Sequence, residues 1–200
     1  MMFSSTCTAA ALLDGVIEEL ALLTPPSRTA LRDALNECLT RLYTEIIREE
    51  RRAYATPNGL RVMLASLSTP SGCASVREED ISSAWSGDRQ LRFLPPTMLS
   101  LGGTGYYTLQ DGALILSDAA DGDRLAIDYI ARPLRFTAEN EDDTIPFPEE
   151  FLSLLRCRVR GEGCRLAGED TAAAKWLGEY NTALSEFRLW YAATLAERGR

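Results

Sequence analysis

The chain has 200 residues, a formal net charge of −8, no histidine and one lysine, Lys175. Its length and its hydrophobic content of 46% are typical of a soluble protein with one domain or two small ones. The acidic balance argues against a protein that grips nucleic acid or an anionic membrane, and the lack of histidine removes the commonest general base and metal ligand.

The cysteines and the apolar segments exclude further classes. The five cysteines form no Cys-x-x-Cys pair, so neither a disulfide framework nor a zinc site is predicted, and reduced cytoplasmic thiols fit. We expect no signal peptide, because no basic region precedes an apolar core at the N-terminus, and no membrane span, because no apolar run is long enough.

Two helices are predicted at the N-terminus. Ser4-Ser5-Thr6 offers a cap for the first, whose apolar residues recur at helical spacing until Pro25-Pro26. Ser27 offers a cap for the second, which has leucines on one face and mixed charges on the other. The second helix is expected to end near Thr56.

The segment from residue 57 to residue 104 has weaker patterns. Residues 60–67 and 76–85 each fit either a strand or a short helix, and Gln90 to Leu94 predicts a strand that ends at Pro95-Pro96. The glycines of residues 102–105 lack the lysine and the helix start of a phosphate-binding loop, so we interpret them as a turn.

A hairpin and a third strand are the clearest local signals. Tyr106-Tyr107 opens one strand, and Asp111-Gly112 provides a tight turn into the apolar strand 113–116. Residues 124–131 alternate as in a half-buried antiparallel strand, with Leu125, Ile127, Tyr129 and Ala131 on one face. The loop between these strands contains Asp118, Asp121 and Asp123 but lacks the glycine and distal glutamate of a helix-loop-helix calcium site, so no metal is predicted.

An acidic stretch and a helical hairpin complete the chain. Between Thr137 and Glu150 there are six acidic residues and no basic one, and Pro148 is expected to open a helix. This helix carries four arginines, Gly161 and Gly163, turns at Gly168-Glu169-Asp170 and is followed by a last helix with an aromatic stripe. The stripe is interpreted as core or interface. The candidate interface residues are Glu139, Glu141, Asp142, Asp143, Arg156 and Arg160.

These patterns predict an α+β fold that is mainly helical. The N-terminal helix pair and the C-terminal helical hairpin are expected to form a bundle from residues 1–56 and 146–200. A small antiparallel β-module is expected to be inserted as residues 57–145.

The order of these parts resembles the phage head-tail connector proteins, known as adaptors or tail tubular protein A. In that family a strand with a proline-rich exit is followed by a Tyr-Tyr strand, an apolar strand, a strand that ends in Arg-Pro, an acidic loop and a helical hairpin. The matching segments here are Leu91-Arg92-Phe93, Tyr106-Tyr107, Ala113 to Leu116, Tyr129 to Pro133, Glu139 to Asp143, and Phe151 to Asp170. Residues 7–54 are similar to the opening helices of the family. Ser117-Asp118-Ala119-Ala120 departs from the proline-containing run that the family often has at this point.

The resemblance implies a structural protein of the virion neck, at the head-tail junction, with no cofactor. Such proteins form a dodecameric ring beneath the portal protein, extend the DNA channel and dock the tail or the next neck protein. Genomic DNA would pass through the ring without specific binding, and no membrane would be involved. The acidic residues 139–150 would then pair with Arg156 and Arg160 of a neighbouring subunit.

Two other functions remain open on the sequence alone. One is a helical binding or regulatory module of the cytoplasm. The other is a hydrolase or nuclease based on the carboxylates of Asp128, Asp142 and Asp143, although these residues do not have the spacing of metal ligands. A structural, non-enzymatic role is the favoured prediction.

Overall fold

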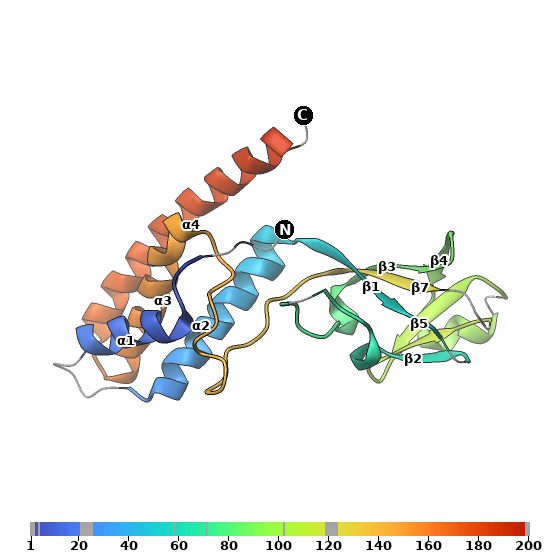
Figure 1. Ribbon diagram of the computed structural model, residues 1–200, viewed down its shortest axis with the longest axis horizontal. Coiled ribbons are helices and arrows are strands. Elements are labelled where there is room, and N and C mark those ends of the chain that lie inside the picture. The colour runs from blue at the N-terminus through green and yellow to red at the C-terminus, as the bar shows by residue number, and fades with distance from the viewer. Residues whose placement is uncertain are drawn as a thin grey trace. The chain divides into compact units, whose positions relative to one another are not determined.

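The computed structural model describes residues 3, 5–20, 26–57, 59–70, 72–101, 103–118 and 124–198. The chain divides into two compact units (Figure 1). The helical unit comprises Met1–Ile47 and Arg135–Arg200, and the sheet unit comprises Arg48–Leu134.

The helical unit contains four α-helices and a π-helical turn among its described residues. They are α1 (Ala9–Glu19), α2 (Arg28–Leu42), the π-helical turn Tyr43–Ile47, α3 (Leu152–Leu166) and α4 (Asp170–Arg198). The Ser27 hydroxyl accepts a hydrogen bond from Ala30 N, which confirms the predicted cap of α2, whereas α1 is capped by Thr8 rather than by residues 4–6. No described helix is both long enough and apolar enough to cross a membrane.

The core of this unit gathers the apolar faces of α1, α2 and α3 around the aromatic stripe of α4. The Phe187 ring is fully buried and lies 4.9 Å from that of Phe147, centroid to centroid, and 5.9 Å from that of Tyr191. Gly163 lets α3 approach its neighbours closely, because a Cβ at this position would overlap the buried Leu20 side chain. The aromatic stripe is therefore core, as one of the two interpretations predicted.

The sheet unit contains one curled, half-barrel sheet of seven strands in the order β1-β7-β3-β4-β5-β6-β2. The strands are β1 (Glu50–Ala55), β2 (Arg61–Met63), β3 (Ile81–Ser86), β4 (Arg89–Phe93), β5 (Tyr106–Gln110), β6 (Ala113–Leu116) and β7 (Leu125–Ile130). All neighbouring strands are antiparallel except β4 and β5. The chain leaves β4 at Pro95, passes through the short 3-10 helix Pro96–Leu101 and returns to start β5 in the same direction.

The predicted hairpin is confirmed. Gln110 pairs with Ala113, and Asp111 and Gly112 adopt φ angles of 53° and 69°. Two consecutive positive φ angles match the right-handed twist of the flanking strands, which explains why Asp-Gly stands here. In β7, Leu125, Ile127 and Tyr129 are buried, as the alternation predicted.

The expected fold class is wrong in the size and nature of its β part. The structure is about 48% helical, and the β part is a seven-stranded mixed sheet rather than a small antiparallel module. Residues 50–55, expected to be helical, form β1, because Arg48 at a φ angle of 45° ends the helical path and the segment then pairs with β7. The ambiguous segments 60–67 and 76–85 contribute β2 and β3, each followed or preceded by a single 3-10 turn.

Candidate functional site

The acidic stretch is organised by one carboxylate, Glu141. Its two oxygens accept hydrogen bonds from Nε of Arg28 at 2.7 Å and from Nη1 of Arg32 at 2.8 Å, and its side chain is only 10% exposed. Burial raises the pKa of Glu141, but the hydrogen bonds and charges of the two arginines outweigh it, and the net shift is downward. Glu141 therefore remains a carboxylate and ties the stretch to the first two turns of α2.

The backbone of the same stretch binds the start of α1. Ala10 N donates to the Glu141 carbonyl at 2.8 Å, and Ala9 N donates to the Asp143 carbonyl at 3.2 Å. The first N–H groups of a helix have no partner within it. The acidic stretch supplies that partner, so its path is fixed by the fold.

The remaining candidate acids lie in solvent. Glu139, Asp142 and Asp143 are exposed and form no ion pair with any residue that the structure describes. Their carboxylates are thus open to a partner from outside the chain.

The two candidate arginines differ in their surroundings. Arg160 forms an ion pair with Glu19 at 3.0 Å, and its guanidinium lies 3.7 Å from the centroid of the Trp176 ring. It links α1, α3 and α4. Arg156 is exposed, lies near Gly15 of α1 and has no ion pair within the described part of the chain.

Within one subunit, the structure does not bring the candidate acids to the candidate arginines. Glu141 pairs instead with Arg28 and Arg32, two residues that the sequence analysis had not singled out. The two arginines are four residues apart in the first turns of α2, so the sequence shows that they lie on one face of the helix. It does not show that their partner is a glutamate more than 100 positions away.

A second ordered carboxylate, Asp128, lies on β7 of the sheet unit. It accepts hydrogen bonds from the Arg52 guanidinium, the Ser83 hydroxyl at 2.7 Å and Nε1 of Trp85 at 2.8 Å. The Arg52 hydrogen bond, followed by those of Ser83 and Trp85, outweighs burial and holds the pKa of Asp128 at about 2. All these donors come from the chain itself, so this carboxylate is committed to joining β1, β3 and β7.

The aspartates of the loop before β7 are described only in part. Asp118 accepts from Gly105 N at 2.8 Å and pairs with Arg89 at 2.9 Å, whereas Asp121 and Asp123 lie outside the described residues. Among the described residues, no cluster of three or more acidic or cysteine side chains could hold a metal ion.

The Tyr-Tyr strand β5, the Arg-Pro exit of β7 and the acidic stretch before a helical hairpin follow one another in the order on which the resemblance in the sequence rests. A sequence model of the family described as SU10 adaptor protein matches residues 8–199. The chain belongs to this family, which confirms the resemblance and makes the protein a structural adaptor of a phage particle. No curated protein matches the chain.

Proposed function

We propose that the chain is the subunit of a dodecameric ring that lies beneath the portal protein in the virion neck. The ring extends the DNA channel and docks the tail or the next neck protein. The observation that carries this proposal is the adaptor family match, which spans 192 consecutive residues, from 8 to 199. A match of that length includes both compact units and both helix pairs.

The charge of the subunit supports a channel through which DNA moves. A ring of twelve such chains would carry a large negative charge, and like charge repels the phosphate backbone. Proteins that hold DNA neutralise phosphates with lysine and arginine, and this chain has more acids than bases. DNA would therefore slide through the ring without being retained.

Helix α4 supports assembly because its last turns extend past the other helices of the part of the helical unit that the structure describes. The Phe151 ring, next to the start of α3, lies 5.1 Å from the Trp190 ring, so α3 covers α4 up to about this level. Beyond it α4 continues to Arg198, past the other helices (Figure 1). Leu195 is 49% exposed on this part of the helix, and Leu189, just before Trp190, is 75% exposed. Exposed leucines in such a position are typical of surfaces that a partner covers.

Open charges support contacts between neighbouring subunits. Asp142 and Asp143 project from a rigid stretch, and Arg156 stands on α3 without an ion pair to a described residue. Pairs between these acids of one subunit and Arg156 of the next would use side chains that the fold leaves free. Glu141 and Arg160 would hold the two segments in place, and Glu139 would lie at the margin of the contact.

The test is sedimentation of purified portal rings with an excess of the chain. We expect about twelve chains to sediment with each portal ring, and Leu189→Asp to reduce that number while circular dichroism shows unchanged unfolding. Portal rings that sediment without the chain at saturating concentration would contradict the proposal.

A further inference from the structure

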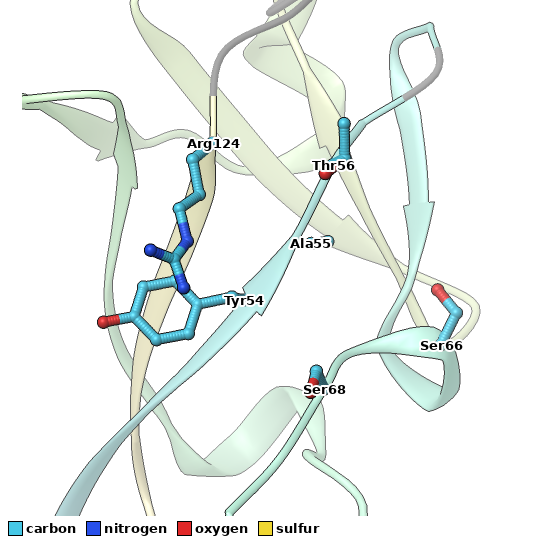
Figure 2. Close-up of a pocket in the computed structure, with 6 residues that line it drawn as sticks. All are labelled: Tyr54, Ala55, Thr56, Ser66, Ser68 and Arg124. Atoms are coloured by element: carbon cyan, nitrogen blue, oxygen red, sulfur yellow. The ribbon is translucent and has the colours of Figure 1, made fainter.

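An open pocket of about 520 Å³, with a mixed polar and apolar lining, lies on the sheet unit at the end of β1. Tyr54 and Ala55 of β1 line one part of the pocket, together with Thr56, the residue after β1. Ser66 and Ser68, from the segment that follows β2, and Arg124, just before β7, complete the lining. Figure 2 shows the Arg124 side chain extended along the Tyr54 ring, with the two serines carried by the neighbouring segment.

Arg124 is a preorganised cation, because an aromatic ring holds its side chain in place. Its guanidinium carbon lies 3.6 Å from the centroid of the Tyr54 ring, so one face of the group is covered. It forms no ion pair with any described residue, unlike Arg52 and Arg89 of the same unit. Stacking restrains the guanidinium but leaves its N–H edge open, and that edge fits a carboxylate with two parallel hydrogen bonds.

The backbone beside Arg124 offers an open strand edge. Tyr54 N donates to the Ser68 carbonyl at 3.2 Å, and Ser68 N donates to the Tyr54 carbonyl at 2.9 Å. An antiparallel pair would next join Thr56 to Ser66, but the chain forms a 3-10 turn over Leu64–Ser66 and leaves that pairing unmade. Peptide groups two residues apart in a strand point the same way. Continuation of β1 by one residue, to Thr56, would turn the N–H and C=O of Thr56 toward the pocket that this residue lines.

We propose that this pocket binds an extended peptide segment of a partner protein that carries a carboxylate side chain. The segment would add a short strand at Thr56, and its aspartate or glutamate would meet Arg124 and the hydroxyl of Ser68, because the Ser66 hydroxyl already donates to the Met63 carbonyl at 2.7 Å. Strand addition provides main-chain hydrogen bonds, and one charged pocket provides selectivity for the side chain. The site is local to the sheet unit and does not depend on a ring or on a portal.

A peptide partner fits better than DNA, although both carry anions. The guanidinium of Arg124, on a chain of charge −8, gives little attraction for a polyanion. A peptide strand whose only charge is one carboxylate experiences much less of the repulsion from the acidic chain than DNA does. The unfilled backbone edge at Thr56 has a complement only in another polypeptide.

The test is a titration of the full chain with the blocked pentapeptide Thr-Val-Asp-Val-Thr, followed by the backbone amide signals of Thr56 and Ser68 in NMR. We expect saturable shifts of these signals, and weaker binding by about tenfold for the matched peptide with asparagine in place of aspartate. Arg124→Gln should weaken binding of the aspartate peptide by a similar factor. Arg61→Gln, at an exposed arginine of β2, should leave it unchanged.

Three results would overturn the proposal. The first is equal binding of the aspartate and asparagine peptides. The second is a response of the same signals to inorganic phosphate or to a DNA duplex but not to the peptide. The third is a change in these signals when the protein concentration is varied, as self-association would cause, with no response to the peptide. Sedimentation with portal rings is a separate measurement, so failure of peptide binding and failure of the ring proposal are distinguishable.

Discussion

The carboxylate of Glu141 lies 2.8 Å from Nη1 of Arg32, and both side chains are nearly withdrawn from solvent, at 10% and 15% exposed. Arg28 adds a second hydrogen bond to the same carboxylate from a more exposed position. This contact holds the acidic stretch against α2 and therefore fixes the positions of the exposed Asp142 and Asp143 beside Glu141.

Glu141→Gln is expected to destabilise the helical unit. The substitution removes the negative charge that compensates Arg32 and Arg28, and breaking a buried pair costs about 3–5 kcal/mol. Arg28 is 37% exposed and can be hydrated, so we expect a loss of about 2 kcal/mol in the free energy of unfolding. Urea unfolding followed by circular dichroism measures it. Glu139→Gln, at an exposed position, is the control and should stay within about 0.5 kcal/mol of the wild type.

Gly163→Ala and Gly178→Ala are expected to have opposite effects. Alanine favours a helix by about 1 kcal/mol over glycine, and at Gly178 of α4 nothing lies within 4 Å of an added Cβ. Gly178→Ala should therefore raise stability by about 0.5–1 kcal/mol. At Gly163 the added Cβ would overlap Leu20, so overpacking should outweigh the gain and lower stability by about 1–2 kcal/mol. Thermal unfolding that shifts in the same direction for both variants would contradict the packing described for α3.

The stability of the sheet unit is expected to depend on Asp128 at low pH. The pKa of Asp128 is lowered to about 2 in the folded chain, first by Arg52, and a carboxylate of an unfolded chain titrates near 4. The stabilisation is thus fully present above about pH 4 and is lost as the pH falls toward 2. We expect the Trp85 indole N–H signal in NMR to titrate in this range, because Trp85 Nε1 donates to Asp128. Asp128→Asn should abolish that titration, and Asp88→Asn, in an exposed turn, should not.

The ring contact proposed for the open charges predicts a charge-swap result. Arg156→Glu should weaken ring formation in native mass spectrometry, and so should Asp142→Arg combined with Asp143→Arg. The three substitutions together should restore rings, because the attraction returns with reversed signs. Arg61→Glu, at an exposed arginine of β2 that no proposed ring contact uses, is the matched control. If rings form as in the wild type both in Arg156→Glu and in the Asp142→Arg, Asp143→Arg double variant, these residues do not form the contact.

Helix caps and tight turns could be predicted from the sequence because they depend only on residues close together in the chain. Ser27 before α2 and Asp111-Gly112 between β5 and β6 each satisfy backbone requirements within a few residues, and both were predicted correctly. The family resemblance rested on the order of such segments, and that order proved diagnostic.

Long-range partners decided what the sequence left unresolved. Arg51-Arg52-Ala53-Tyr54 is as compatible with a helix as with a strand, and it forms β1 because β7 offers it a hydrogen-bonded neighbour. The partners of Glu141 lie 109 and 113 positions away, and Arg124, just before β7, meets Tyr54 of the neighbouring strand β1. Such contacts have no local pattern, so neither the full extent of the sheet nor the pocket could be predicted.

The central claim is tested most directly by electron cryo-microscopy of portal rings incubated with the purified chain. The account predicts a second ring coaxial with the portal, with twelve copies of the chain around an open channel. Portal particles without added density, or chains bound singly at irregular positions, would contradict it.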